Sequence, residues 1–179
     1  MTRGGNNRAR PYSGKYRGTV VNNVDPDGLG RLLVTVPDVL GDDPCIWAES
    51  ASPLAGPEMG LYAVPPIGAG VWVELQQDDP DFAVWTGCWR GSSNDVPARA
   101  SSAPPTLPPL VLQTQAQNRL IISSTPGECL IVETSQGELG PRIVVTASGI
   151  TLTSGKGASI ELSGAGVKIN GDGLTVDAL

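Results

Sequence analysis

Apolar and polar residues alternate in short runs through the first half of the chain. Strict alternation over four to eight residues is typical of a strand that buries one face. Within residues 31–37 it predicts that Leu33 faces one side, while Leu32, Val34 and Val36 face the other. The pattern predicts strands at residues 16–22, 31–37, 45–49, 71–76 and 83–89, with a weaker candidate at 61–64.

The segments between these strands are rich in turn-forming residues. Residues 25–30 read Asp-Pro-Asp-Gly-Leu-Gly, which predicts that the first two strands form a hairpin. Short strands with strong turn signals between them fit a small Greek-key barrel of the OB type.

The second half of the chain follows a different rule, in which apolar residues come in doublets two positions apart. The step between doublets is 10 or 13 residues at first and 7 or 10 later. Each unit therefore predicts a strand of about three residues with one apolar face, followed by a turn. The apolar positions are Leu110, Leu112, Leu120, Ile122, Leu130, Val132, Ile143, Val145, Ile150, Leu152, Ile160, Leu162, Val167, Ile169, Leu174 and Val176. The turns are assigned to Gly149, Gly155, Gly164, Gly166, Gly171 and Gly173.

One such strand cannot bury its doublet, because its other face is polar and no helix is predicted to cover it. A single-chain β-helix needs coils of about 18 residues, so the short later units favour a coil to which three chains each contribute one face. The doublets then line a shared axis, and folding is inseparable from trimerisation. The alternative is a flat meander of short hairpins lying against the barrel, which predicts strands of five or six residues and two-residue turns.

The chain is thus predicted to be all-β, with an N-terminal OB-type Greek-key barrel followed by a C-terminal triple-stranded (trimeric) β-helix needle. The barrel is assigned to residues 15–91 and the needle to residues 110–179. The Pro/Ser-rich linker 92–109 is not expected to form a packed element. Residues 1–14 are a basic arm, expected to be flexible, which is either a solvated tail or a segment that docks on a partner.

The composition excludes several kinds of chemistry. Histidine is absent, which removes Ser-His-Asp and Cys-His catalysis and His-ligated zinc. The cysteines, Cys45, Cys88 and Cys129, are far apart in the sequence and are expected to be buried thiols. Residues 25–36 lack the last acidic ligand of a calcium loop, because Val36 holds that position. We predict no enzymatic activity, no catalytic residue, no cofactor and no metal site.

No apolar run approaches the roughly 20 residues of a membrane-spanning helix, and the N-terminus lacks the hydrophobic core of a signal peptide. The protein is therefore expected to be assembled in the cytoplasm and to leave it only as part of a larger particle.

Four blocks of the barrel region carry motifs: residues 18–37, Trp47-Ala48, residues 65–74 and residues 79–87. They resemble the phage baseplate assembly protein V family, which includes the central spikes of contractile phage tails and the valine-glycine-repeat spikes of type VI secretion. Residues 110–179 are similar to the needle of that family in style rather than in residues. The usual Gly-Asp-Pro of the closing hairpin is Asp78-Asp79-Pro80 here.

The resemblance implies a non-enzymatic homotrimer, the central spike of a contractile tail or injection machine. It implies a baseplate hub protein above the barrels, and a needle that pierces the target envelope on sheath contraction, in transient contact with the target membrane. A small conical tip protein is expected on the apolar end formed by Leu174, Val176 and Leu179. Some members carry a lysozyme or another effector between barrel and needle, whereas only the linker 92–109 occupies that place here.

An alternative function for an OB barrel is binding of single-stranded nucleic acid through a basic groove and stacking aromatics. The chain supplies Trp47, Trp72, Trp85 and Trp89, but twelve carboxylates against two arginines lie between residues 25 and 95. Such a charge repels a phosphate backbone, so we predict no nucleic-acid partner.

Overall fold

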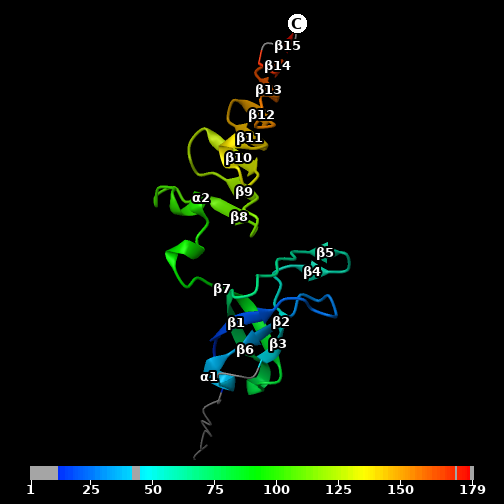
Figure 1. The fold of residues 1–179 in the computed structure, drawn as a ribbon, viewed down its shortest axis with the longest axis vertical. Coiled ribbons are helices and arrows are strands. Elements are labelled where there is room, and N and C mark those ends of the chain that lie inside the picture. Colours follow the sequence, from blue (N-terminus) through cyan, green and yellow to red (C-terminus); the bar gives the residue numbers. More distant parts are fainter. Residues whose placement is uncertain (1–11, 42–44, 172, 178–179) are drawn as a thin grey trace, which may run out of the picture. The chain divides into compact units, whose positions relative to one another are not determined.

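The computed structural model describes residues 12–41, 45–171 and 173–177, the last three by their backbone alone. Apart from residues 12–14, the predicted N-terminal arm lies outside the described residues. The chain divides into two compact units, Met1–Gly91 and Ser92–Leu179, both built mainly of strands (Figure 1). The all-β prediction is confirmed. The alternation did not predict five short helical turns: α1 (Pro37–Leu40), η1 (Gln76–Asp78), η2 (Ser93–Asp95), α2 (Ala98–Ser101) and η3 (Gly137–Leu139).

The first unit is a closed five-stranded barrel, as predicted, with the strand order β1-β2-β3-β7-β6. All neighbouring pairs are antiparallel except β3 and β7, which are parallel. Closure leaves the barrel without a free sheet edge. Its strands are β1 (Tyr16–Asn22), β2 (Leu32–Thr35), β3 (Cys45–Ser50), β6 (Gly70–Leu75) and β7 (Ala83–Trp89).

The barrel interior is filled mainly by valine and leucine side chains. Leu32, Val34 and Val36 are fully buried, which confirms the face predicted from the alternation of residues 31–37. They pack with buried residues of the other strands: Val20, Ala48, Val71, Val73, Ala83 and Trp85. Strand β2 is shorter than predicted because Pro37 opens α1, where its missing N–H costs nothing.

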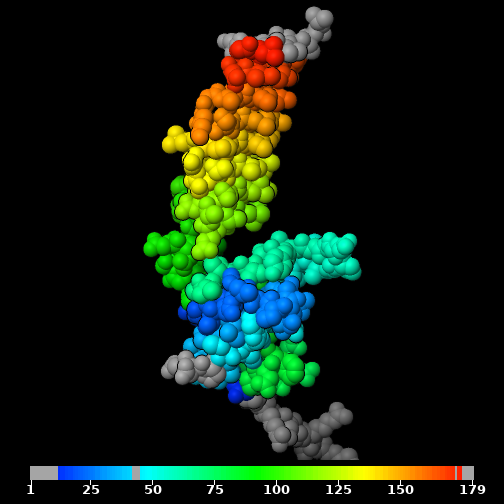
Figure 2. All heavy atoms as spheres, turned by 45° about the vertical axis from the view of Figure 1, so that its right-hand side comes forward, coloured from blue at the N-terminus to red at the C-terminus, as the bar shows by residue number. Residues whose placement is uncertain are grey.

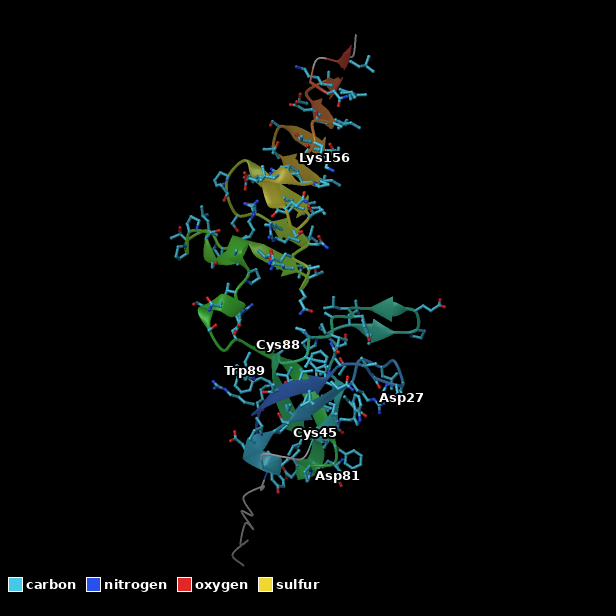
Figure 3. All side chains as sticks on the ribbon, viewed as in Figure 1. Asp27, Cys45, Asp81, Cys88, Trp89 and Lys156 are labelled. Carbon is cyan, nitrogen blue, oxygen red and sulfur yellow. The ribbon has the colours of Figure 1, made fainter. Side chains whose placement is uncertain are left out.

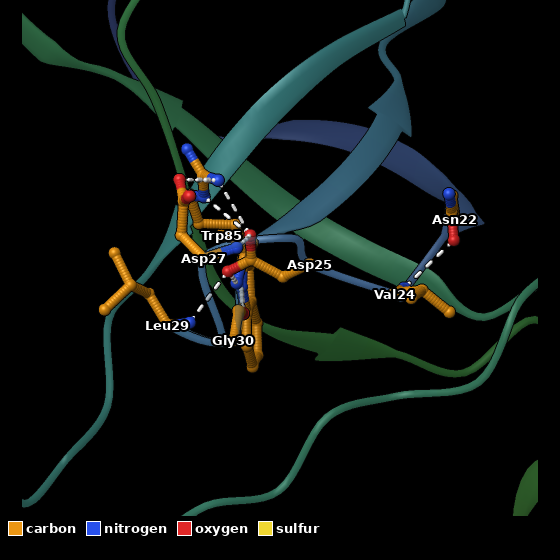
Figure 4. Close-up of polar contacts among 8 residues, drawn as sticks. Asn22, Val24, Asp25, Asp27, Leu29, Gly30 and Trp85 are labelled. Atoms are coloured by element: carbon orange, nitrogen blue, oxygen red, sulfur yellow. Dashed lines mark hydrogen bonds and ion pairs between the residues drawn. The ribbon is translucent and has the colours of Figure 1, made fainter.

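The turn between β1 and β2 is organised by one carboxylate, Asp25. Its oxygens accept hydrogen bonds from the backbone N–H groups of Asp27, Leu29 and Arg31 and from the Arg31 guanidinium (Figure 4). These bonds hold the pKa of Asp25 well below its usual range, the Arg31 side chain being the main cause. The indole N–H of Trp85 donates to the Gly30 carbonyl at 3.1 Å, which ties the turn to β7. The carboxylate therefore serves a structural turn, as expected for a segment without a complete calcium loop.

Residues 51–64 form an arm that leaves the barrel between β3 and β6 (Figure 1). The weaker strand candidate at 61–64 is wrong. The arm instead contains the two-residue strands β4 (Ala55–Gly56) and β5 (Met59–Gly60), which pair with each other. Leu61 donates its backbone N–H to the Leu54 carbonyl, and the Ser52 hydroxyl donates to the carbonyls of Leu54 and Leu61. These local bonds close the arm on itself, and residues 61–64 pair with no barrel strand, although Val64 packs against the barrel core.

The second unit contains one antiparallel meander of eight strands, in which each strand pairs with its neighbours in chain order. The colours in Figure 2 follow one another along this unit in the same order. The strands are β8 (Leu110–Gln113), β9 (Arg119–Ile122), β10 (Glu128–Glu133), β11 (Arg142–Thr146), β12 (Gly149–Thr153), β13 (Ser159–Ser163), β14 (Gly166–Ile169) and β15 (Leu174–Asp177).

The connectivity within one chain is therefore the flat meander that stood as the alternative to the β-helix. Strands of four to six residues replace the three expected. The physical reason is that each connection between strands reverses the chain, so consecutive strands become antiparallel neighbours instead of passing around an axis.

The linker 92–109 is more structured than predicted, since η2 and α2 lie within it. Helix α2 packs against β8, and the Arg99 guanidinium makes two hydrogen bonds of 3.0 Å to the Glu133 carboxylate of β10. The expectation that this segment forms no packed element is thus wrong. The partner that fixes it lies 34 residues away in the sequence, beyond the reach of local patterns.

Candidate functional site: the apolar face of the C-terminal sheet

The register of the meander places all the doublet residues on one face in two unbroken columns. The first column follows the pairs Leu110–Ile122, Ile122–Leu130, Leu130–Val145, Val145–Ile150, Ile150–Leu162, Leu162–Val167 and Val167–Val176. The second follows Leu112–Leu120, Leu120–Val132, Val132–Ile143, Ile143–Leu152, Leu152–Ile160, Ile160–Ile169 and Ile169–Leu174. We call this surface the apolar face. The irregular spacing of the early units reflects loop length alone.

The apolar face is not covered by the chain that makes it. Leu112 is 58% exposed and Leu174 is 53% exposed, although both are large aliphatic residues in strands. Ten of the doublet residues are exposed in this way: Leu110, Leu112, Ile122, Val132, Ile143, Ile150, Ile160, Leu162, Ile169 and Leu174. Strands lie about 4.8 Å apart, so the face is roughly 34 Å long. A contiguous apolar stripe of that length marks an interaction surface.

The opposite face changes character along the sheet. Its central column begins with the paired residues Val111, Ile121, Ile131 and Val144 and continues with Thr151, Glu161 and Lys168. Ile121 and Ile131 are buried, whereas Glu161 and Lys168 are exposed. The sheet therefore has a covered outer face at its first strands and a polar outer face at its last ones. The apolar face, by contrast, has exposed hydrophobic side chains from Leu110 on β8 to Leu174 on β15.

A buried carboxylate anchors the covered part of the outer face. The Glu133 side chain is fully buried and accepts a 2.7 Å hydrogen bond from Arg119 in addition to the two from Arg99. Glu138 lies within 4.0 Å of both Arg99 and Arg142. Burial acts to raise the pKa of Glu133, but the hydrogen bonds from the two arginines outweigh it and hold the pKa below its usual range. The alternation of apolar and polar residues did not predict this cluster of charged side chains. Its one indication in the sequence is the carboxylate of Glu133 within the otherwise apolar strand β10.

The glycines assigned to turns do not all lie in turns. Gly155, Gly164 and Gly171 adopt positive φ, and Gly173 lies in the turn before β15. The assignment of Gly149 and Gly166 to turns is wrong, because they are the first residues of β12 and β14. At Gly149 the requirement is close approach: a Cβ atom there would lie 2.1 Å from the Leu162 carbonyl oxygen. The absence of a side chain lets β12 and β13 pair at that point.

The C-terminal end of the face coincides with the last strand of the sheet. β15 is an outer strand in the sheet order, and Leu174 is exposed there. The Val176 side chain and all of Leu179, the other residues expected to contact a tip protein, lie outside the described residues.

Other residues singled out from the sequence lie apart from this face. Cys45, Cys88 and Cys129 are exposed, which overturns the expectation of buried thiols; Figure 3 labels the first two on the barrel. Cys45 and Cys129 are at strand positions opposite the barrel core and the apolar columns, respectively, whereas Cys88 pairs with the buried Val71 near the end of β7. Trp85 is a core residue. The Arg17 guanidinium lies 5.7 Å from the ring centre of Trp72 and 5.0 Å from that of Trp89, and Arg31 lies 5.4 Å from that of Trp47.

Among residues 12–41, 45–171 and 173–177, no group of three or more His, Cys, Asp or Glu side chains is placed to hold a metal ion. No helix in the described part of the chain is long and apolar enough to cross a membrane.

A closed OB-type barrel joined to a sheet whose apolar face needs a partner defines a class of structural, assembly-forming proteins. Comparison with protein families identifies the class more closely. Residues 16–89 match the type VI secretion system/phage-baseplate injector OB domain. Residues 109–175 match the phage baseplate V C-terminal trimerisation domain. The chain belongs to the phage baseplate V family. No curated protein matched the chain.

Proposed function

We propose that three copies of this chain assemble through the apolar face into a trimeric β-helical needle, the central spike of a contractile tail or injection machine. The observation that carries the proposal is the pair of unbroken apolar columns across all eight strands. The match of residues 109–175 to a trimerisation domain supports the number three.

A flat meander in one chain is compatible with a needle made of three. If each chain contributes one wall of a three-sided prism, its apolar columns face the axis and its polar residues face water. Burying the remaining surface of ten half-exposed Leu, Ile and Val side chains contributes about 1 kcal/mol each. That stabilisation is absent from the isolated chain, so we expect this unit to fold with trimer formation.

The remaining parts of the proposal follow from membership of the family. The barrels dock beneath a baseplate hub protein, the needle pierces the target envelope when the sheath contracts, and the protein acts without enzymatic activity. A small tip protein covers the open end at Leu174, Val176 and Leu179. Deletion of residues 174–179 is then expected to abolish retention of a tip protein in a pull-down while leaving the trimer intact.

The first test is the mass of the purified protein by light scattering. We expect three times 18.5 kDa, with a trimer band on an unboiled SDS gel. The Ile160→Asp variant places a carboxylate on the apolar face three times per trimer. Ile160 is 40% exposed in one chain, so the lost aliphatic burial costs about 1 kcal/mol for each copy and about 3 kcal/mol per trimer. Each carboxylate buried without a partner in the apolar interface adds a desolvation cost of about 2 kcal/mol or more.

The Ile160→Asp variant should therefore be a monomer. The matched control is Ser163→Asp, which places the same charge on the exposed outer face of the same strand and should remain a trimer. A wild-type monomer, or a stable Ile160→Asp trimer, would refute the proposal.

A further inference from the structure

The two edges of the C-terminal sheet differ in the connections that they carry. Because each strand reverses direction, alternate connections lie on the same edge. The edge that we call the loop edge carries residues 114–118, 134–141, 154–158 and 170–173. The opposite edge, which we call the turn edge, carries residues 123–127, 147–148 and 164–165. The last two of these are tight turns, so one edge of the sheet is bulky and the other is slim.

The loop edge carries an apolar side chain on a backbone that is held in place. Leu139 is 82% exposed, the highest value among the large apolar residues in the part of the chain that the structure describes. Its backbone N–H donates to the Gln136 carbonyl. A Cβ atom on Gly155 would lie 2.4 Å from the Leu139 carbonyl oxygen, so the loops 134–141 and 154–158 stack on each other. Figure 3 labels Lys156 on the second of these loops.

The turn edge presents a small and neutral surface at the level of Leu139. Strand β11 runs from the loop edge to the turn edge, and Ala147 directly follows its last residue. The Thr146 hydroxyl accepts hydrogen bonds of 3.2 Å from the backbone N–H groups of Ser148 and Gly149. The turn thus satisfies its own polar groups and leaves Ala147 exposed, so covering it strands few polar groups. None of the three connections on this edge contains a charged residue.

We propose that Leu139 of each copy packs on Ala147 of the next copy and so closes the corner between two walls of the needle. The inference rests on the trimer proposed above. Copies around a threefold axis are related by rotation alone, so the loop edge of one wall meets the turn edge of its neighbour without a shift along the axis. Leu139 and Ala147 flank the same strand and are therefore brought to the same corner.

Symmetry and chemistry together favour this pair. One exposed leucine is ordinary on a protein surface, but Leu139 lies at the border of the apolar face, whose burial between copies the trimer requires. The bulky edge of one copy fits the slim edge of the next. The corner contact is then continuous with the buried axis and keeps water out of the seam.

The test is chemical cross-linking of the intact trimer through two introduced cysteines, Leu139→Cys and Ala147→Cys, with Cys45, Cys88 and Cys129 replaced by serine. Within one chain the two positions are separated by the length of β11, at least about 17 Å at roughly 3.4 Å per residue. A bis-maleimide shorter than half that length therefore links only different copies. We expect a covalent trimer on a boiled gel, because every copy gives one link and receives one.

The controls use the same two positions. Each single variant alone should give no linked product, because a threefold axis places like positions at different corners. Chains with Leu139→Cys and chains with Ala147→Cys, mixed before assembly, should give dimers between unlike chains. Ile160→Asp, added to the double variant, should abolish every product.

A trimer of the expected mass that gives no linked product, or a product from a single variant, would overturn the corner contact and leave the proposed function standing. A link that persists in the Ile160→Asp monomer would lie within one chain and would overturn the contact as well. A monomeric mass for the wild-type protein would refute the proposed function itself.

A second measurement is the temperature at which the trimer band disappears from an SDS gel. Leu139→Ser should lower this temperature, because the leucine loses its contact with the neighbouring copy. The matched control is Lys156→Ser, an exposed position on the adjacent loop, which should leave it unchanged. An unchanged temperature for Leu139→Ser would show that the trimer makes no use of this side chain, which contradicts the contact.

Discussion

The buried Glu133 gives the sharpest test of how the second unit is built. Its side chain has no exposed surface, and it accepts three hydrogen bonds from Arg99 and Arg119. Glu133→Gln keeps the shape and one acceptor but removes the charge and turns an amide N–H₂ toward a guanidinium. The Arg119 side chain, only 11% exposed, is then left without its counter-charge.

The expected cost is about 3–5 kcal/mol per chain, the range for removing one partner of a buried ion pair. Arg99 loses at least one of its two bonds to residue 133, so the effect extends to the segment that Arg99 holds against β10. Opening of α2 should become at least roughly 100-fold more frequent, since about 1.4 kcal/mol corresponds to a factor of ten.

Two assays measure this cost independently. Thermal unfolding of the sheet is followed by far-ultraviolet circular dichroism, whereas all four tryptophans lie between residues 47 and 89, so their fluorescence reports on the barrel alone. Glu133→Gln should lower the sheet transition and leave the fluorescence transition unchanged. Trypsin should also cleave after Arg99 much faster in the variant. The matched control is Glu161→Gln, an exposed carboxylate on the same outer face.

A change in sheet stability below about 0.5 kcal/mol, or an unchanged rate of cleavage at Arg99, would refute this reasoning. The pH dependence gives a further check. The pKa of Glu133 is lowered in the folded protein, so its contribution is complete above the unfolded pKa of about 4.3 and is lost as the pH falls through the folded value. The Glu133→Gln variant should lack that acid-dependent loss.

Three further predictions concern single positions. The pKa of Asp25 is lowered in the folded protein, so its contribution to barrel stability is lost as the pH falls below about 4. Asp25→Asn should lower the midpoint of barrel unfolding at pH 7, followed by tryptophan fluorescence, and should remove this acid dependence. A variant with the wild-type pH profile would contradict the role assigned to Asp25. Gly149→Ala brings a Cβ atom into the Leu162 carbonyl oxygen and should destabilise the sheet by about 1–3 kcal/mol, measured by circular dichroism, whereas unchanged unfolding would show that β12 and β13 are not paired as described. Gln77 has φ of 54°, so Gln77→Gly should raise barrel stability by about 0.5–1 kcal/mol, and a loss of stability in urea unfolding would contradict a left-handed backbone there.

Side-chain alternation is local, since neighbouring positions of a strand point to opposite faces. For that reason the buried set Leu32, Val34 and Val36 and the membership of the apolar face followed from the sequence. The barrel type followed as well, because turn residues set the strand boundaries.

The predictions that were wrong concern residues whose structure depends on a partner far away in the sequence or on which side chains cover them. The linker was expected to be unpacked, yet Glu133, 34 residues further on, holds Arg99 against the sheet. The cysteines were expected to be buried because the residue type favours burial, but Cys45, Cys88 and Cys129 stand at exposed positions. The strand expected at 61–64 is part of the arm, where the chain bonds to itself.

The sequence by itself determined which residues form the apolar face and that one chain cannot bury them, because a period-two pattern assigns faces without reference to any partner. Only the tertiary structure decided that the strands form an antiparallel meander whose doublets align in two columns. Register depends on hydrogen bonds between strands, and turn direction decides whether successive strands reverse or continue, so neither is contained in the periodicity.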